Sequence, residues 1–431
     1  MAILRQGDLV MKDIIPLIDE SLSTLKDFQT NTVKAIIKQF ASNETNRILV
    51  GDEVGLGKTV VAKGVIAELL KLKLGKGSNK VSKVPFRVTY ICSNLTLAEE
   101  NRKKLAVFRG KSASEYVQEP SFGRLLELAM PRAMDSNVGG KKLLELCSLT
   151  PSTSFNLTNG DGNKKERAIL FLLLCEHRKL AGYRHELDTF FRAGVGGWDD
   201  LNNWLSDEFI IDENIKKDFF TALDCEISEK ESRDCRIDNT YCSWLRALLG
   251  YSKGEFRFCE TKYEKRFRSY LRQMLARACA RHISADLFIL DEFQRFKSLL
   301  DSNVENDQSL IAREVLRDKR DTKVLLLSAT PFKALSKVEE DEEGEAHAEE
   351  LKFLLAFLSQ SNQGILDEYE KDRMALHQQL LALRDDKSDV NLVDDSHKLA
   401  IESILTRYIA RTERAQISHN YEGLFSNNHK V

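Results

Sequence analysis

The segment Asp52–Thr59 constrains the fold of this chain more than any other feature. It reads Asp-Glu-Val-Gly-Leu-Gly-Lys-Thr, after an apolar run at Arg47–Gly51 that predicts a short buried strand. The residues that follow, Thr59–Leu72, have the apolar spacing of a helix. Strand, glycine turn, Lys-Thr and helix in this order are typical of a phosphate-binding loop. The glycines let backbone N–H groups turn inward, and the helix directs its positive end at the same anion.

This loop predicts ATP and Mg²⁺ as ligands. Gly55 and Gly57 shape the turn, Lys58 is expected to reach the β- and γ-phosphates, and Thr59 is expected to coordinate Mg²⁺. The general pattern has glycine where this chain has Asp52. The alternative to a phosphate loop is a coincidental glycine turn, but strand, glycines, Lys-Thr and helix all occur in order.

Two acidic residues follow a second apolar run. Leu287–Leu290 predicts a buried strand, and Asp291 and Glu292 come directly after it. Ligands of open α/β sheets bind at the carboxyl ends of the strands. Asp291 is therefore expected to hold Mg²⁺, and Glu292 to orient the attacking water. Asp-Glu after a strand is common by itself and often marks only the start of a helix. The pair indicates an ATP site because it occurs together with the phosphate loop.

A third apolar run, Val324–Leu327, precedes Ser328-Ala329-Thr330-Pro331. With GDEVGLGKT at 51–59 and DEFQ at 291–294, the order of motifs resembles superfamily-two helicases, and the phosphate loop is especially similar to the Swi/Snf branch. The resemblance implies a RecA-like lobe of a nucleic-acid-dependent ATPase, either a helicase or a double-strand translocase, with DNA as the expected partner. It also implies that Ser328 and Thr330 link hydrolysis to movement along the nucleic acid.

The same resemblance extends to weaker matches. Gln29 lies 29 residues before Lys58, similar to the glutamine that reads adenine in the family. Gln294 stands where the family more often has His or Asp, and its amide can still hydrogen-bond to the third motif. Ile91–Leu95 resembles the strand-to-helix motif that contacts the nucleic-acid backbone, although it lacks the usual proline.

The pattern and the resemblance together predict an α/β fold in four parts: a RecA-like lobe with a parallel sheet, which is split into two parts, a large insertion and a C-terminal segment. Residues 1–109 form the first part of the ATP-binding lobe, and residues 283–335 form the second part. Residues 110–282 carry glycine clusters and helical periodicity, with few strand-like runs, so we expect a mainly helical insertion. Residues 336–431 are expected to be a helical extension or a linker to a missing second lobe, with a solvated acid-rich loop at 339–350.

Arginine placement suggests that the site needs a partner. Complete helicases close two RecA-like lobes over ATP, and the second lobe supplies arginines that stabilise the transferring phosphoryl group. Gly-Arg, part of the family's arginine motif, occurs only at Gly123-Arg124, before the acidic pair. We therefore expect a second RecA-like lobe, or a partner protein acting in trans, to complete the site.

A basic segment at 253–282 has two interpretations. Arginines and lysines, among them Arg266, Arg268 and Arg272, alternate with aromatic residues. Such a segment could grip a nucleic-acid backbone and stack bases. It could equally be an amphipathic helix whose aromatic residues face the core.

Composition sets the remaining limits. Lys+Arg is 64 and Asp+Glu is 66, so any nucleic-acid contact must come from a local patch. Eight cysteines include no CxxC pair; Cys225, Cys235, Cys242 and Cys259 could hold zinc or could be free thiols. The N-terminal residues do not resemble a signal peptide, and the longest apolar run is too short to span a bilayer, so a cytoplasmic protein is expected.

Two other functions stay open at this stage. The chain could be an ATP-binding regulatory or interaction protein with little turnover. It could also be a P-loop ATPase that acts on protein instead of nucleic acid. Stimulation of hydrolysis by nucleic acid separates the helicase-type reading from both.

Overall fold

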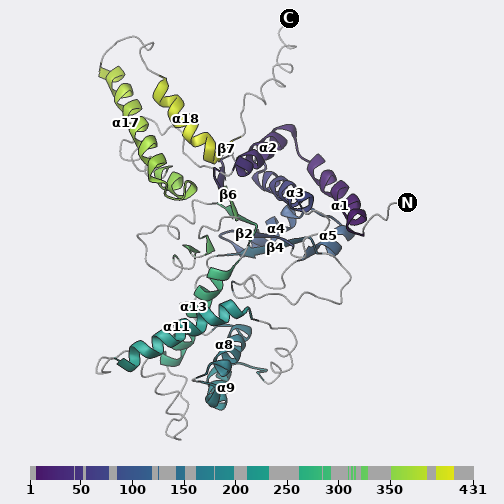
Figure 1. The fold of residues 1–431 in the computed structure, drawn as a ribbon, viewed down its shortest axis with the longest axis vertical. Helices are drawn as coiled ribbons and strands as arrows, with labels where there is room; N and C mark the ends of the chain where they lie inside the picture. The colour runs from purple at the N-terminus through teal and green to yellow at the C-terminus, as the bar shows by residue number, and fades with distance from the viewer. Residues whose placement is uncertain are drawn as a thin grey trace, which may run out of the picture.

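One parallel sheet organises the fold (Figure 1), and its seven strands lie in the order β3-β4-β2-β5-β6-β1-β7. The strands are β1 (Arg47–Val50), β2 (Phe86–Ile91), β3 (Val117–Gln118), β4 (Leu144–Leu149), β5 (Leu287–Asp291), β6 (Lys323–Leu327) and β7 (Ile409–Ala410). The computed structural model describes residues 6–42, 44–51, 55–76, 85–118, 125, 142–150, 162–178, 180–198, 211–232, 262–283, 285–292, 309, 312–313, 315–316, 322–328, 351–385 and 395–411.

Alternation along the strands produces two cores, because successive side chains point to opposite faces of a sheet. In β1, Ile48 and Val50 belong to one core, and Leu49 belongs to the other. The first core is shared with α1 (Gln6–Ser23), α2 (Asp27–Ser42), α3 (Lys58–Lys76) and α4 (Leu95–Leu105). The second includes apolar residues of 312–316 and of the helical stretch 351–358. The α/β class predicted from the sequence is therefore confirmed.

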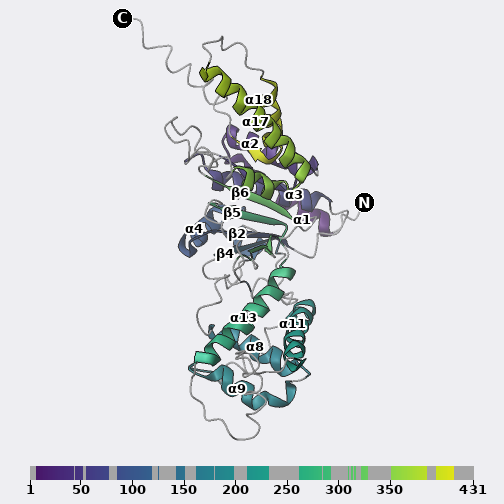
Figure 2. The ribbon, with the colours of Figure 1, turned by 90° about the vertical axis from the view of Figure 1, so that its left-hand side faces the viewer.

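A helical unit lies at one end of the molecule, below the sheet in Figures 1 and 2. It consists of α8 (Lys164–Glu176), α9 (Arg184–Arg192), α11 (Glu213–Ser232) and α13 (Lys262–His282), with a short 3₁₀ turn at Ala181–Tyr183. Aromatic side chains fill its interior, where Phe171 and Trp198 meet edge to face. In Figure 2, α13 extends from this unit toward the sheet, and β5 follows it in the chain.

The expectation of a mainly helical segment over 110–282 needs a correction. Within it, β3 and β4 are strands of the central sheet, and β4 pairs with β2 along its whole length. Five of the six β4 residues are buried, since neighbouring strands flank β4 on both sides. Glu145 is compensated by Arg87, its neighbour in register on β2, whose Nε donates to Oε2 at 3.1 Å. Among the described residues, the helical unit begins at Lys164.

The C-terminal segment also joins the sheet, which the expected helical extension did not include. The helices α17 (Gln363–Asp385) and α18 (Ser396–Tyr408) run side by side and lead into β7, which pairs with β1 (Figure 1). Gly51 donates its N–H to the carbonyl oxygen of Ala410 at 3.0 Å. Buried Arg47 donates to the carbonyl oxygens of Phe357 and Leu316 at 2.9 and 3.0 Å. The strand that leads into the phosphate loop is therefore tied to residues more than 260 positions later.

None of the helices in the described part of the chain is long and apolar enough to cross a membrane.

Candidate functional site

The predicted phosphate loop connects the end of β1 to the start of α3. Gly55 and Gly57 have φ angles of 91° and 80°, in the left-handed region that favours glycine. A Cβ added at Gly57 would lie 2.7 Å from Nε2 of Gln29, so a side chain here would displace the Gln29 amide. The carbonyl oxygen of Gly57 accepts the N–H groups of Val60 and Val61 and begins the helix. Residues 52–54 of the motif lie outside the described residues.

Lys58 and Thr59 are the first two residues of this 19-residue helix, and both are half-buried. The first N–H groups of a helix have no partner within the helix, and the helix dipole adds positive charge at the same end. A phosphate group is the ligand that this end of α3 suits best. Lys58 and Thr59 therefore lie at the N-terminal end of the helix after the glycine turn, as the sequence predicted.

Gln29 contacts the phosphate loop itself. It is 7% exposed, and its Nε2 donates to the carbonyl oxygen of Leu56 at 3.2 Å. Its Oε1 accepts the N–H of Lys26 at 3.1 Å, at the start of α2. Both ends of the Gln29 amide therefore form hydrogen bonds with the protein backbone, and these bonds connect α2 to the phosphate loop.

The two predicted acids lie two strands away from the phosphate loop, at the same edge of the sheet. Asp291 is in register with Leu327 of β6, and Leu327 is in register with Val50 of β1. Ser328, which is 3% exposed, donates its N–H to the carbonyl oxygen of Val50 at 3.1 Å. The carboxyl ends of three adjacent parallel strands thus bring together the start of the phosphate loop, Ser328 and the acids, where ligands of α/β sheets bind.

Three donors surround the carboxylate of Asp291. Tyr90 donates its hydroxyl to Oδ2, and Asn101 donates Nδ2 to the same oxygen at 3.4 Å. The backbone N–H of Glu292 donates to Oδ1 at 3.0 Å. Burial, followed by the negative charge of Asp291, raises the pKa of the Tyr90 phenol, so this hydroxyl is a donor at neutral pH.

Glu292 is held in an unusual backbone conformation. Its φ is 56°, which costs energy for a non-glycine residue, and residues strained in this way cluster at functional sites. Its Oε2 accepts the hydroxyl of Ser93 at 3.3 Å. Ser93 follows β2 by two residues, and Asn94 beside it caps α4 through its Oδ1. The β2–α4 connection therefore contacts Glu292 directly.

The sequence did not predict Tyr90 or Asn101 as site residues, and it placed Ser93 only in the motif expected to contact nucleic acid. Tyr90 precedes the predicted strand-to-helix motif at 91–95 and Asn101 follows it, so that motif included neither residue. The available signal was the position of Tyr90 and Ser93 at the carboxyl end of a strand, where ligands bind. Two predicted residues, Gln294 and Thr330, lie outside the described residues.

The site chemistry fits magnesium and a nucleoside triphosphate. Thr59 and Asp291 carry side-chain oxygens, and Mg²⁺ is usually held by one or two carboxylates together with substrate phosphates. Left-handed glycines and the α3 N-terminus form the cradle that phosphates require. No cluster of three or more His, Cys, Asp or Glu suited to a metal occurs among the described residues. Of the proposed zinc ligands, Cys225 is described as exposed, and Cys235, Cys242 and Cys259 lie outside that part of the chain.

Two arginines of the basic segment, Arg268 and Arg272, have structural roles. Arg268 is fully buried and donates to the carbonyl oxygen of Phe190 at 3.0 Å. Arg272 is 4% exposed and forms an ion pair with Glu166, with Nη2 2.9 Å from Oε2. Buried arginines cannot grip a nucleic-acid backbone, so the amphipathic-helix interpretation applies to both. Nothing is described of the side chain of Arg266.

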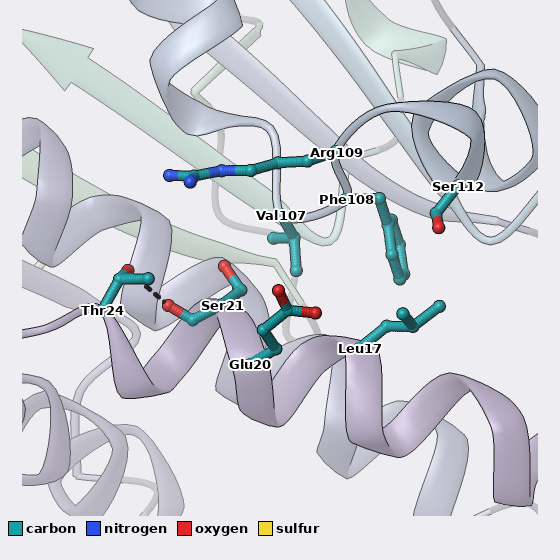
Figure 3. Close-up of a pocket in the computed structure, with 8 residues that line it drawn as sticks. All are labelled: Leu17, Glu20, Ser21, Thr24, Val107, Phe108, Arg109 and Ser112. Carbon is teal, nitrogen blue, oxygen red and sulfur yellow. Dashed lines mark hydrogen bonds between the residues drawn. The ribbon is translucent and has the colours of Figure 1, made fainter.

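A separate hollow lies between α1 and the residues after α4 (Figure 3). Apolar residues Leu17, Val107 and Phe108 line it together with Glu20, Ser21, Thr24, Arg109 and Ser112. Ser21 Oγ is buried without a hydrogen-bond partner among the described residues. Burial, and then the positive charge of Arg109, lowers the pKa of nearby Lys63. The hollow includes none of the phosphate-loop residues or acids, so it is distinct from the site described above.

Comparisons with known proteins leave the site to be interpreted from its own chemistry. No protein-family model matches this chain, and no curated protein matches it significantly.

Proposed function

We propose that this chain is a RecA-like ATP-binding lobe of a nucleic-acid-dependent ATPase, of the superfamily-two helicase or translocase type. One observation carries the proposal. The adjacent strands β1, β6 and β5 end in register, with a glycine turn and helix after the first and Asp291-Glu292 at the third. Phosphate cradle and acids therefore share one sheet edge, as ATP hydrolysis requires.

Each residue has a defined task in this proposal. The N–H groups at the start of α3, together with Lys58, bind the β- and γ-phosphates. Thr59 and Asp291 would hold the magnesium ion, which neutralises charge on the phosphates when bound. Glu292 orients and polarises the attacking water. Ser328 directly follows β6, which lies between β1 and β5, and it is the coupling residue.

An arginine from elsewhere is part of the proposal. The phosphate cradle and the acids belong to one sheet, so they approach the nucleotide from one lobe. Charge on the transferring phosphoryl group is usually stabilised by an arginine in cis or in trans, which contributes a factor of about 10³–10⁵ to turnover. A second RecA-like lobe or a partner protein would supply it.

Hydrolysis of ATP with and without nucleic acid tests the function. The full chain is assayed with Mg²⁺-ATP alone, and then with single-stranded DNA, double-stranded DNA and RNA. We expect slow turnover that rises with DNA and disappears in Lys58→Ala. Failure to bind ATP would contradict the proposal. Turnover that no nucleic acid alters would instead favour an ATPase that acts on protein, and binding without turnover would favour a regulatory protein.

A further inference from the structure

The side chain of Asp291 is held by residues of two other elements. Tyr90 comes from β2 and Asn101 from α4, whereas Asp291 ends β5. Asn101 Nδ2 donates to the Tyr90 hydroxyl oxygen at 2.8 Å and to Asp291 Oδ2 at 3.4 Å, and Tyr90 donates to the same Oδ2. These three side chains form a closed ring of hydrogen bonds.

The ring is anchored in the core. Tyr90 is 1% exposed, and its aromatic body packs in the core between the sheet and α1–α4. A buried phenol of this kind has few alternative positions, because protein interiors are closely packed. The Tyr90 hydroxyl therefore has a fixed position. The Asp291 carboxylate, which accepts a hydrogen bond from this fixed donor, loses its rotational freedom.

The acceptor positions of Asp291 are almost filled. A carboxylate offers about four lone-pair positions on its two oxygens. Tyr90 and Asn101 take two on Oδ2, and the N–H of Glu292 takes one on Oδ1. With the donors of the described residues placed, about one position, on Oδ1, is left for a further ligand.

We propose that Tyr90 and Asn101 are positioning residues that fix Asp291 and direct its remaining Oδ1 acceptor position to magnesium or to a water of its hydration shell. The inference rests on the proposed function, because it assigns the magnesium contact to Asp291. Partners that orient a metal ligand typically account for 10- to 100-fold in metal affinity. The assignment also makes the β2–α4 segment part of the nucleotide site.

A magnesium titration of nucleotide binding tests the proposal. Binding of a fluorescent ATP analogue to the full chain is measured as Mg²⁺ is raised from an EDTA baseline. In Tyr90→Phe, the half-saturating Mg²⁺ concentration should rise about 10-fold, whereas affinity without Mg²⁺ stays the same. Asn101→Ala should raise the half-saturating Mg²⁺ concentration less than Tyr90→Phe does. In the double variant Tyr90→Phe/Asn101→Ala, the loss of binding free energy should be smaller than the sum of the two single losses, because both residues act on one oxygen.

Tyr369→Phe is the matched control. Tyr369 is buried in α17, so this variant also removes a buried hydroxyl, at a site away from the acids. It should leave the Mg²⁺ dependence unchanged. If the parent chain shows a Mg²⁺ dependence and Tyr90→Phe shows the same one, the positioning role is overturned but the proposed function is not. If Tyr90→Phe instead lowers both the nucleotide affinity without Mg²⁺ and the unfolding midpoint, the positioning role is also overturned, since these changes indicate a structural role. A parent chain that binds no nucleotide overturns this inference and the proposed function together.

Discussion

Gln29 donates a hydrogen bond from Nε2 to the carbonyl oxygen of Leu56, between the two glycines of the phosphate loop, at 3.2 Å. The resemblance to helicases implies that this glutamine reads adenine, but the contact indicates a second task. A glutamine bonded to the loop backbone can set the loop conformation for any nucleoside triphosphate. The two tasks predict different base dependence.

Gln29→Ala should weaken ATP and GTP binding about equally, by roughly 5-fold. The estimate corresponds to one net hydrogen bond of about 1 kcal/mol. Equilibrium titration with labelled ATP and GTP checks it. Gln39→Ala is the control, because Gln39 lies on the same helix but donates to the carbonyl oxygen of Thr406. A loss confined to ATP would instead support the adenine task.

The sequence predicted the strands of the site well, for a physical reason. β1, β5 and β6 each lie between two other strands, so they contain continuous apolar runs with turn signals at their ends. β4 was missed because Leu143, Leu144, Leu146 and Leu149 have spacings that also suit a helix. β7 has only two residues, and its pairing with β1 depends on a contact distant in sequence.

The site acids were predictable, but their partners were not. Asp291 and Glu292 follow an apolar run, which is a local signal. Tyr90 and Asn101 lie about 200 residues earlier and become partners of Asp291 only because β2 and β5 are neighbours. Strand order is not encoded in periodicity, so the sequence could not assign this contact. For Arg268 and Arg272 the sequence left two interpretations open, and their burial favours the structural one.

Lys58→Ala should weaken ATP binding by roughly 10- to 100-fold. The variant removes a charge-assisted contact to the phosphates, worth about 1.5–3 kcal/mol. Titration of the folded variant with labelled ATP measures the loss. Lys71→Ala on the same helix is the control; its ion pair with Asp19 is at the surface, so its removal should not alter ATP affinity. Equal affinities for Lys58→Ala and the parent chain would remove Lys58 from the site.

Glu292→Gln should separate binding from hydrolysis. The amide keeps the shape of the side chain but cannot act as the anionic group that orients water. We expect unchanged ATP affinity and a turnover reduced on the order of 10²-fold or more, measured as phosphate release at saturating ATP. Glu99→Gln, at an exposed position on α4, should behave like the parent chain. Full turnover in Glu292→Gln would exclude this residue from the chemistry.

Arg272→Met should destabilise the helical unit. Arg272 and Glu166 are each 5% exposed at the side chain, and both Nε and Nη2 contact Oε2, at 3.0 and 2.9 Å. Glu166 also accepts the N–H of Asn163 in the capping box of α8. Removing the arginine leaves a buried carboxylate uncompensated, which typically costs about 3–5 kcal/mol.

Tryptophan fluorescence during urea unfolding measures this loss selectively. The chain has 3 tryptophans, Trp198, Trp204 and Trp244, all between α9 and α13 in the sequence, so their emission reports on this region. Arg272→Met/Glu166→Gln should recover part of the stability, because no buried charge then lacks its partner. Lys265→Gln, at an exposed position on α13, should unfold like the parent chain. If Arg272→Met instead keeps its unfolding midpoint and loses DNA affinity, Arg272 contacts nucleic acid, and the structural interpretation of this part of α13 is wrong.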